Sequence, residues 1–540
     1  MQNNFIKKGL VFIIIILVIG TNVSASNVNT DNEFKPVKNG NIFYVGGSGS
    51  GNYTIIQDAI DNATDGDTVF VYSGSYYENV LINKSISLIG ENKSNTIIEG
   101  RKKRDVINIV ASNVLVQNFL LNNSGQFIGN AGIKIYEEID NIKIKNNIIM
   151  NNIVGICIGD TYFYDKITHI TIENNLIQNE RYGVVLYVCF ENTISNNTFI
   201  NNGIFISYGY TTDNTIINNT VNGRPLIYLE KQSDKIIEPN VGQIILVNCD
   251  KITVTNQCLD KVCWIGIELI RCTDCNIFKN YISNKSWSIF SLDSENNNIQ
   301  ENVLENNSYA IYLKDSDKHA VSFNKINNSL DSIHLYYSNF NTVSFNTITN
   351  SRTGIHLSHS CDNIIFQNKI NYTLDHGIDL SFGCSRNKFL NNTITNCWDA
   401  GIYILGKSKI WWDLASIRNV ISGNELTNNV WGVLLEKAAL TTISYNNIFQ
   451  NYYGVEIISS KYNKIFNNNI FENKLEDAFF KNSFSSRFDR NFWNETKQVH
   501  KINGGIYIYS YWGDSWELVF RLIRFDWNPV KEPYNILNVI

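Results

Sequence analysis

A short pattern returns every 22 residues between Ile267 and Leu357, and it restricts the folds that are open to this chain. Each unit is an Ile, one variable residue and, in most copies, a Leu. The units begin at Ile267, Ile289, Ile311, Ile333 and Ile355. An Asn series keeps the same spacing at Asn280, Asn302, Asn324, Asn346 and Asn368. A fixed short period is the signature of a solenoid, in which each repeat buries its apolar face by stacking on its neighbours.

The residues within one coil indicate short strands. Between Asn341 and Cys361 the chain has three segments of alternating apolar and polar residues, at 342–345, 346–350 and 354–357. Period-two alternation over so few residues is typical of strands and not of helices. We therefore predict an all-β fold, a single-stranded right-handed parallel β-helix with three short strands in each coil. The right hand is expected because crossovers between parallel strands are nearly always right-handed.

Asn residues mark the bends between the predicted strands. Asn tolerates left-handed backbone angles better than other residues that carry a Cβ. When Asn residues stack in register, each amide can also bond to the Asn above and below it. We expect these roles in the pairs Asn302/Asn306, Asn324/Asn328, Asn346/Asn350, Asn392/Asn396 and Asn424/Asn428.

Residues 1–25 are typical of a secretory signal peptide. Lys7 and Lys8 precede the apolar run 10–19, and residues 23–25, Val-Ser-Ala, offer a small-residue cleavage site. The apolar run is too short to span a bilayer, and an uncleaved membrane anchor is the alternative. We expect a secreted or cell-surface protein whose membrane contact is limited to this segment or, weakly, to its C-terminal end.

The sequence also predicts where the β-helix begins and ends and which segments flank it. We predict a linker at 26–42, the β-helix at 43–480 with insertions near 223–244 and 407–419, and an aromatic-rich C-terminal cap at 481–540. Ile55, Ile56, Ala59 and Ile60 give the apolar stripe of a short N-terminal capping helix. Both ends of a solenoid need covers because they expose strand edges and core. A membrane-surface helix at 516–525 is the alternative for the C-terminal end.

Composition narrows the range of partners. The chain has 540 residues, 18% of them charged, with a net charge of −5 and only 5 Pro. It also has no long run of Lys or Arg. Binding to phosphates needs clustered positive charge, so we expect no nucleic acid partner. We expect the protein to be a monomer.

The ten cysteines could form disulfides outside the cytoplasm. Cys361 and Cys384 each follow the first Ile of their strand by six residues, and Cys249 and Cys272 follow theirs by five. Neighbouring strands lie about 4.8 Å apart, within the Cα separation that a disulfide tolerates. Two disulfides, Cys361–Cys384 and Cys249–Cys272, are therefore geometrically allowed candidates, and buried free thiols are the equally weighted alternative.

Residues 43–100, which begin FYVGGSGSGNYTIIQDAIDNATDGDTVF, resemble the opening of pectin-lyase-like β-helix proteins. With the Asn-rich coils and the segment VNGRPLIYLE at 221–230, the chain is most similar to the NosD-type branch. This branch is also described as carbohydrate-binding and sugar-hydrolase (CASH) repeats, and it includes many secreted archaeal proteins. The resemblance implies a β-helix over about residues 43–480, and NosD itself implies periplasmic copper handling. It leaves the activity open because one scaffold hosts lyases, hydrolases, epimerases, adhesins and binding proteins.

The middle residue of each Ile-x-Leu unit is expected to face solvent, since the flanking residues point inward. In consecutive coils the middle residues form a stripe of Tyr312, His334, His356, Asp379 and Tyr403. Exposed aromatic rings can stack on a sugar while charged groups bond its hydroxyls. We therefore assign polysaccharide binding to Tyr312, His334, His356 and Tyr403, and to Arg352 in the neighbouring turn.

The same stripe could carry catalysis or a metal ion. Asp375, Asp379 and Asp399 are the candidate catalytic carboxylates of a hydrolase or lyase, since two carboxyls at glycosidase distance can act as acid and base. Hydrolysis requires that these carboxyls face each other and are not held in salt bridges. His334, His356 and Asp379 could instead hold a metal. No pattern requires a cofactor, and calcium or copper are the ions to consider.

Three functions therefore stay open, and whether the protein is an enzyme is open with them. The first is a secreted or cell-surface β-helix that binds, and could process, polysaccharide or envelope glycan along the stripe. The second is a non-enzymatic envelope or adhesion protein in which the rod is a spacer. The third is NosD-like periplasmic copper handling.

Overall fold

The computed structural model describes residues 40–127, 129–136, 138–160, 167–207, 211–406, 416–483, 485–494, 500–510 and 515–536. These residues form a parallel β-solenoid of about 20 turns with almost no helix, which confirms the predicted fold class. The predicted signal peptide, the linker up to residue 39 and residues 407–415 of the second predicted insertion lie outside the described residues.

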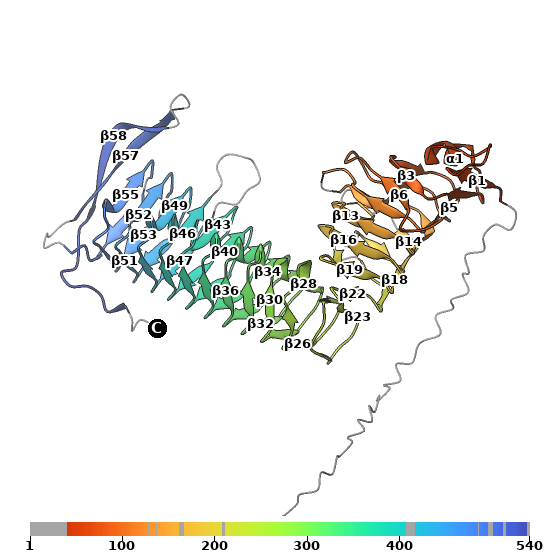
Figure 1. Cartoon of the computed structure of the whole chain (residues 1–540). Coiled ribbons are helices and arrows are strands. Elements are labelled where there is room, and N and C mark those ends of the chain that lie inside the picture. The colour runs from red at the N-terminus through yellow and green to blue at the C-terminus, as the bar shows by residue number, and fades with distance from the viewer. Residues whose placement is uncertain are drawn as a thin grey trace, which may run out of the picture.

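The first arm of the solenoid has three parallel sheets, to which successive strands of the chain contribute in turn (Figure 1). One sheet runs from β1 (Ile42–Val45) to β21 (Thr215–Ile217). Another runs from β3 (Gly74–Tyr76) to β22 (Thr220–Val221). The remaining sheet runs from β4 (Val80–Ile82) to β20 (Ile204–Ile206). Apolar residues at alternate positions of these strands fill the core between the sheets.

The second arm again has three parallel sheets, which we call the inner, second and third sheets. The second sheet runs from β24 (Ile236–Ile237) to β56 (Arg487–Asp489), and the third from β27 (Cys258–Leu259) to β54 (Asn469–Phe471). The strands of the inner sheet are β23 (Arg224–Glu230), β25 (Gln243–Val247), β28 (Cys263–Ile270), β31 (Lys285–Leu292), β34 (Tyr309–Lys314), β37 (Asp331–Tyr336), β40 (Thr353–Ser358), β43 (Ile378–Ser381), β46 (Ala400–Leu405), β49 (Trp431–Glu436), β52 (Tyr453–Ile458), β55 (Glu476–Lys481), β57 (His500–Ser510) and β58 (Ser515–Asp526).

The two arms join where the chain reverses direction at Asn222 and Gly223. β22 pairs antiparallel with the first residues of β23, and Gly223 has a φ of 80°, which glycine adopts without steric cost. From this point the two arms diverge as a V (Figure 1). The residues predicted as an insertion near 223–244 contain β23 and β24 and therefore begin the second arm.

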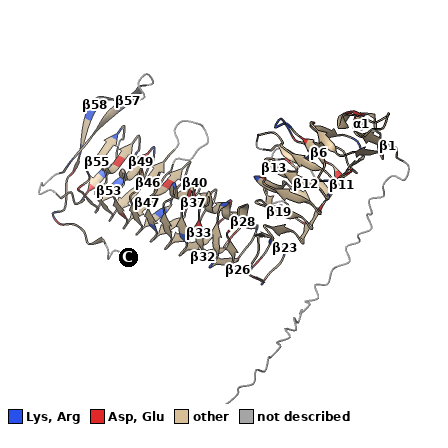
Figure 2. Ribbon diagram, in the orientation of Figure 1, with Lys and Arg blue, Asp and Glu red and all other residues tan. Residues whose placement is uncertain are grey.

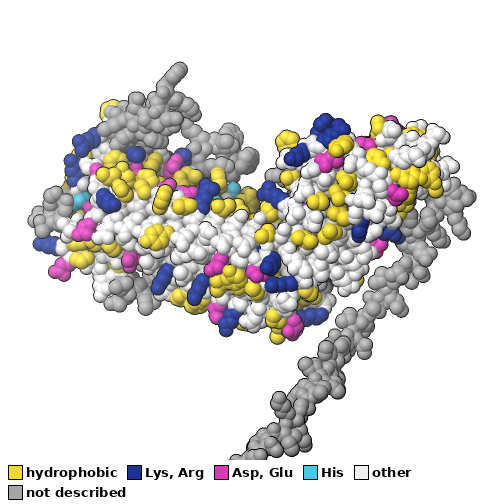
Figure 3. All heavy atoms as spheres, viewed as in Figure 1, with side chains coloured by type: hydrophobic (Ala, Val, Ile, Leu, Met, Phe, Trp, Pro, Cys, Tyr) yellow, Lys and Arg dark blue, Asp and Glu magenta, His cyan; other side chains and the backbone are white. Residues whose placement is uncertain are grey.

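The bend turns the outward face of the inner sheet toward the first arm, and we call this the inner face. At the apex the two arms touch: the Phe205 ring lies 5.3 Å from the Trp287 ring, and the Ile206 N–H donates to Glu268. Glu268 and Phe290 are consequently buried. The prediction that middle residues face solvent is therefore wrong at the apex. Beyond the apex a gap separates the arms (Figure 3).

The two members of each Asn pair have different roles. Asn346 is buried, and its Oδ1 accepts hydrogen bonds from the backbone N–H and the Nδ2 of Asn324, both at 3.0 Å. Its own Nδ2 donates to the carbonyl of Val321 and to Asn368. The second members lie in turns with left-handed backbone angles, at Asn306, Asn328, Asn350, Asn396 and Asn428. The ladder and the turn roles predicted for Asn are thus divided between two positions.

Charged residues are spread along both arms (Figure 2). Many pair with an opposite charge in the next coil, such as Lys279 with Glu301 and Arg386 with Asp362. Exposed pairs of this kind contribute little stability each. Their main effect is to balance charge along the surface.

The two ends of the solenoid have different structures. Helix α1 (Ile56–Asn62) buries Ile56, Ala59 and Ile60, as the apolar stripe predicts. At the other end β57 pairs parallel with β55 and antiparallel with β58. Residues 516–525 therefore belong to a strand, and the alternative of a membrane-surface helix there is wrong. The capping roles of both ends stay predictions. None of the described helices has the length and apolarity to cross a membrane.

All ten cysteines are free thiols. Cys249 and Cys272 lie in adjacent coils, and their side chains hydrogen-bond to each other. That disulfide stays a prediction. For Cys361 and Cys384 the predicted register is wrong by one residue. The Ser360 N–H donates to Cys384 Sγ, so Cys384 lies beside Ser360 and not beside Cys361. The physical reason is an extra residue in the turn after β43.

Candidate metal-binding site on the inner face

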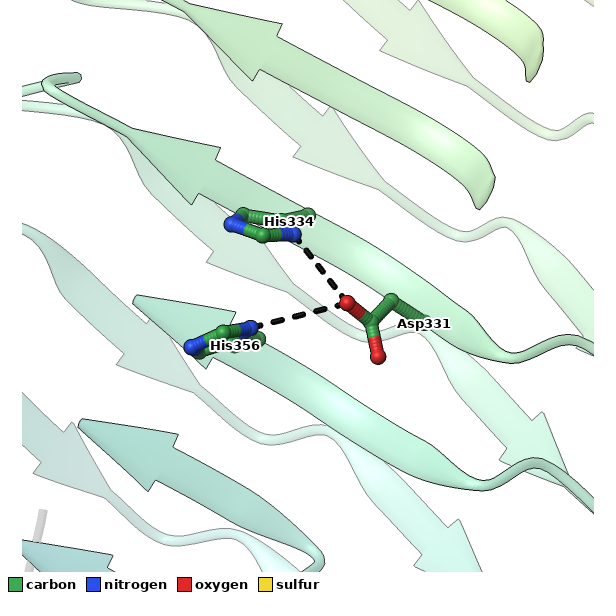
Figure 4. A group of neighbouring side chains, drawn as sticks. All are labelled: Asp331, His334 and His356. Carbon is green, nitrogen blue, oxygen red and sulfur yellow. Dashed lines mark hydrogen bonds and ion pairs between the residues drawn. The ribbon is translucent and has the colours of Figure 1, made fainter. Parts of the chain in front are cut away.

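Three consecutive strands of the inner sheet, β37, β40 and β43, bring imidazole and carboxylate side chains together. Their register aligns His334 with His356 and His356 with Asp379. Because adjacent strands are about 4.8 Å apart, these side chains stack on the inner face, as the sequence predicts. Asp331, the first residue of β37, points toward the two histidines (Figure 4). The side chains of His334 and His356 are 11% and 20% exposed, so the group is mostly shielded from solvent.

One oxygen of Asp331 contacts both histidines. Asp331 Oδ2 lies 3.1 Å from His334 Nδ1 and 3.5 Å from His356 Nδ1 (Figure 4). The two imidazole rings are 4.3 Å apart between centroids. One ligand atom from each residue lies within 4.8 Å of the other two. Two imidazole nitrogens and one carboxylate oxygen therefore converge on a single small volume.

The two histidines of this group have pKa values that are shifted in opposite directions. Burial lowers the pKa of His334, although Asp331 opposes the shift. Burial would also lower the pKa of His356, but the carboxylates of Asp331 and Asp379 outweigh it and the net pKa is raised. Burial would raise the pKa of Asp331, but the hydrogen bonds with both histidines hold it well below its usual value. The group therefore favours an ionised carboxylate beside one neutral and one more basic imidazole.

The second nitrogen of His356 has its own partners. Its Nε2 lies 3.0 Å from Ser381 Oγ and 3.6 Å from Asp379 Oδ2. Burial raises the pKa of Asp379. The structure thus brings Asp331, and not Asp379, to the two Nδ1 atoms, while Asp379 lies behind His356. The order Ser381–His356–Asp331 has the connectivity of a catalytic triad, but Ser381 is buried and shares the Nε2 atom with Asp379. We therefore assign its hydroxyl to orienting the ring.

A second group of ligand-type residues lies in the next two coils and consists of Asp375, His376 and Asp399. His376 Nε2 is 3.5 Å from Asp375 Oδ1, and its Nδ1 is 3.8 Å from Asp399 Oδ1. The backbone N–H of Ala400 donates to Nδ1 at 3.3 Å. The proton of a neutral His376 ring therefore lies on Nε2, and neither nitrogen keeps a lone pair for a metal. A metal could bind His376 Nδ1 only if the hydrogen bond from Ala400 were lost, so we do not propose this group as a second metal site.

The three predicted catalytic carboxylates each lie within ion-pair distance of a basic side chain. Asp375 Oδ2 is 3.9 Å from Arg352 Nε, and Asp375 and Asp399 both contact His376. Asp379 contacts His356. Each of the three carboxyls is therefore engaged by a histidine or arginine side chain, and we do not propose that they act as an acid and base pair in hydrolysis.

The two tyrosines predicted to stack on sugars have other contacts. The Tyr312 ring lies 4.9 Å from the His334 ring. The Tyr403 ring lies 4.5 Å from the His376 ring, and its hydroxyl donates to Glu436 at 3.0 Å. Burial raises the pKa of both phenols. Polysaccharide binding by Tyr312, Tyr403 and Arg352 stays a prediction.

The sequence places Asp331 in the turn beside the stripe, two residues before Ile333, but does not identify it as a metal ligand. Ser381 also belongs to the site and is not identified from the sequence. Asp331 lies at a strand start, where the chain bends, so strand alternation does not say which way its side chain points. The sequence feature that could have identified Asp331 as a metal ligand is its position three residues before His334. Ser381 lies two residues after Asp379, which alternation places on the same face.

Comparison with known families places the chain among right-handed β-helix proteins. Residues 163–311 match the family described as right handed beta helix region. Residues 247–412 and 324–517 match the family described as periplasmic copper-binding protein (NosD). Together the NosD matches run from residue 247 to 517, half of the chain, and the chain belongs to this family.

One relative is a cell surface glycoprotein of Methanothermus fervidus, which is 36% identical over 104 residues. The matched segment covers 19% of this chain and only 16% of the relative. Among solved structures, the Azotobacter vinelandii mannuronan C-5 epimerase AlgE4 A-module has a TM-score of 0.26 at 12% identity, over 74% of this chain and 92% of that one. The catalytic domain of a GH87 α-1,3-glucanase has a TM-score of 0.30 at 12% identity, over 74% and 66%. These low scores give no basis for transferring an activity.

Proposed function

We propose that this protein binds a divalent transition-metal ion, copper(II) in preference to others, through Asp331, His334 and His356. The observation that carries the proposal is the convergence of two Nδ1 atoms on one carboxylate oxygen. Copper(II) with nitrogen and oxygen ligands prefers square-planar or tetragonal coordination, in which bonds of about 2.0 Å separate neighbouring ligands by about 2.8 Å and opposite ligands by about 4.0 Å. The separations of Asp331 Oδ2 from the two Nδ1 atoms are 3.1 Å and 3.5 Å, and the three ligand atoms lie within 4.8 Å of one another, so they lie close enough together to share one ion.

The donor types favour copper. Imidazole suits copper, zinc, iron and nickel, and among divalent first-row ions Cu²⁺ generally binds a given site most tightly. A histidine that binds a metal usually donates its other N–H to a carboxylate or similar acceptor. Asp379 and Ser381 at His356 Nε2 are such partners. The family description as periplasmic copper-binding protein supports the same ion.

We place the protein outside the cytoplasm, in the envelope or at the cell surface. Three observations support this location: the signal-type N-terminus, the periplasmic family description and the cell surface glycoprotein relative. A spacer or adhesion role would share the location but would not need the inner-face site. A measurement of metal binding therefore distinguishes the metal-binding function from a spacer or adhesion role.

Titration calorimetry with Cu²⁺, Zn²⁺ and Ca²⁺ tests the metal proposal. We expect one equivalent of Cu²⁺ to bind the intact protein, more tightly than Zn²⁺, with no response to Ca²⁺. Asp331→Asn and His334→Ala should each weaken binding at least tenfold. His169→Asn is the matched control, because His169 is a half-exposed histidine of the first arm paired with Glu191. If binding needs millimolar Cu²⁺, or if both site variants bind as well as the intact protein, the proposal is wrong.

We also propose an envelope glycan as the macromolecular partner. This second candidate is favoured by the exposure of large aromatic side chains where the third sheet meets the inner sheet. Trp398 is 73% exposed and Tyr372 is 54% exposed. Rings of this kind offer apolar faces on which sugars stack.

A further inference from the structure

We propose that a pocket around Trp398 binds uncharged sugar units of a glycan chain. This inference rests on the glycan-binding part of the proposed function and gives it a place and a ligand class. The pocket is separate from the metal-binding group, and it lies at the corner where the third sheet passes into the inner sheet.

The pocket has a volume of about 500 Å³ and is built by turns from four consecutive coils. Tyr372 follows β42 (Lys369–Asn371), and Trp398 follows β45 (Thr393–Thr395). Asn428 follows β48 (Glu425–Thr427), and Tyr452 follows β51 (Asn447–Phe449). Because coils are about 4.8 Å apart, these turns span about 14 Å along the solenoid axis. Val430, the short side chain between Trp398 and Tyr452, leaves the space open.

The aromatic side chains of the pocket are unusually exposed. Trp398 is 73%, Tyr372 54% and Tyr452 46% exposed, although burial of a large apolar side chain would stabilise the fold. Clusters of exposed apolar groups usually mark a binding surface. Other exposed rings of this arm stack on each other. The Phe323 and Phe345 rings, for example, are nearly parallel, with their centroids 4.8 Å apart. Among the described residues no aromatic ring stacks on Trp398.

The polar groups of the pocket fit hydroxyls and not charges. Asn396 donates its Nδ2 to Asn371 at 2.8 Å, which leaves its Oδ1 as an acceptor at the pocket wall. Asn428 is exposed at the rim. Every residue that lines the pocket is uncharged. Aromatic faces with amide donors and acceptors suit a neutral sugar. The ammonium group of Lys474 lies 4.3 Å from the centroid of the Tyr452 ring at one end of the pocket. We therefore place the sugar on the Trp398 and Tyr372 rings.

Affinity gel electrophoresis tests this inference with soluble polysaccharides in the gel. The neutral probes are laminarin, dextran and galactomannan, and the acidic probe is polygalacturonate. We expect at least one neutral polysaccharide to retard the intact protein. Trp398→Ala should bind about tenfold more weakly, as the loss of one stacking contact implies. Tyr372→Ala, which removes a ring from a different coil, should also weaken binding.

Phe323→Ala is the matched control, since Phe323 is 53% exposed on another corner of the same arm. It should bind as the intact protein does, and Cu²⁺ titration of Trp398→Ala should be unchanged, which shows that the arm is folded. If no polysaccharide retards the intact protein, both the glycan partner and this pocket are wrong. If the intact protein binds and Trp398→Ala binds equally well, the pocket is wrong but the glycan partner stands. Trp398-dependent binding of polygalacturonate alone would overturn the neutral ligand class.

Discussion

The position of a residue within its coil decides what its side chain does. His334 and His356 occupy equivalent positions in adjacent strands, yet burial lowers the pKa of one while two carboxylates raise that of the other. His319, from the same part of the chain, takes the place of an Asn in the buried ladder between Asn297 and Asn341. Burial lowers its pKa to about 4. His319 is therefore part of the Asn ladder and does not belong to the group of histidines on the inner face.

At the residue scale we predict that Asp379→Asn weakens Cu²⁺ binding by about 10–100-fold, the usual effect of removing a carboxylate that supports a metal-binding histidine. Asp379 contacts His356 Nε2 but not the three converging ligand atoms. The number of bound ions should therefore stay at one while the affinity falls.

Asp375→Asn is the control for this variant, because Asp375 contacts His376 and Arg352. It should leave Cu²⁺ affinity unchanged. Calorimetry measures both variants, and equal affinity in Asp379→Asn and the intact protein would show that Asp379 does not support His356.

The turns between strands hold the coils together as much as the strands do. Each ladder Asn hydrogen-bonds to the backbone of the preceding coil and to the Asn side chain of the next coil. Asn346, for example, accepts from Asn324 and donates to the carbonyl of Val321. Asn350 lies at the surface of the following turn with a φ of 50°. Replacing Asn346 and replacing Asn350 should therefore lower the free energy of unfolding by different amounts.

At the element scale we predict that Asn346→Ala lowers the free energy of unfolding by about 2–5 kcal/mol. The substitution leaves the backbone N–H of Asn324 buried without a partner, at about 1–3 kcal/mol. It also removes two buried hydrogen bonds, to the carbonyl of Val321 and to Asn368, at roughly 0.5–1 kcal/mol each. Asn350→Ala should cost only about 1–2 kcal/mol, the penalty for a left-handed residue with a Cβ.

Urea unfolding followed by circular dichroism measures both losses. Asn350→Gly serves as a control, since glycine accepts the left-handed angles without a steric penalty. Equal destabilisation by Asn346→Ala and Asn350→Ala would mean that the ladder hydrogen bonds do not dominate the stability of the coil.

The shape of the whole molecule depends on the contact between its two arms. At the apex Ile206 of the first arm donates its N–H to Glu268 of the second at 3.3 Å. Glu268 is fully buried, with Ile245 and Phe290 beside it in the adjacent strands. Burial raises the pKa of this carboxyl well above its usual value. The hydrogen bond from Ile206 favours the ionised carboxylate, but burial outweighs it. The folded state is therefore most stable when Glu268 is protonated.

At the scale of the molecule we predict a pH-dependent stability that Glu268→Gln removes. The pKa of Glu in the unfolded chain is about 4.3. Below that pH, Glu268 is protonated in both the folded and the unfolded states, so its raised pKa does not reduce the free energy of unfolding. As the pH rises above the unfolded pKa, ionisation favours the unfolded state increasingly until the folded pKa is passed. Gln can accept the same hydrogen bond but does not ionise.

Thermal unfolding from pH 4 to pH 8 measures this effect. The two proteins should unfold at similar temperatures near pH 4, and the variant should be increasingly more stable as the pH rises. Hydrogen exchange at Ile206 should slow in the variant at pH 8. Glu301→Gln, at an exposed residue paired with Lys279, should behave as the intact protein. A constant difference between Glu268→Gln and the intact protein across this range would contradict the prediction.

The period of the sequence by itself determined the coil, since 22-residue spacing with period-two alternation has a parallel solenoid as its simple solution. It also placed His334, His356 and Asp379 side by side, because residues one period apart must stack. Only the tertiary structure decided that Asp331 and not Asp379 meets the two Nδ1 atoms, because a side chain at a bend has no direction fixed by alternation. Only the tertiary structure showed the reversal at Gly223 and the burial of Glu268, because a repeat specifies contacts between neighbouring coils and not between distant ones.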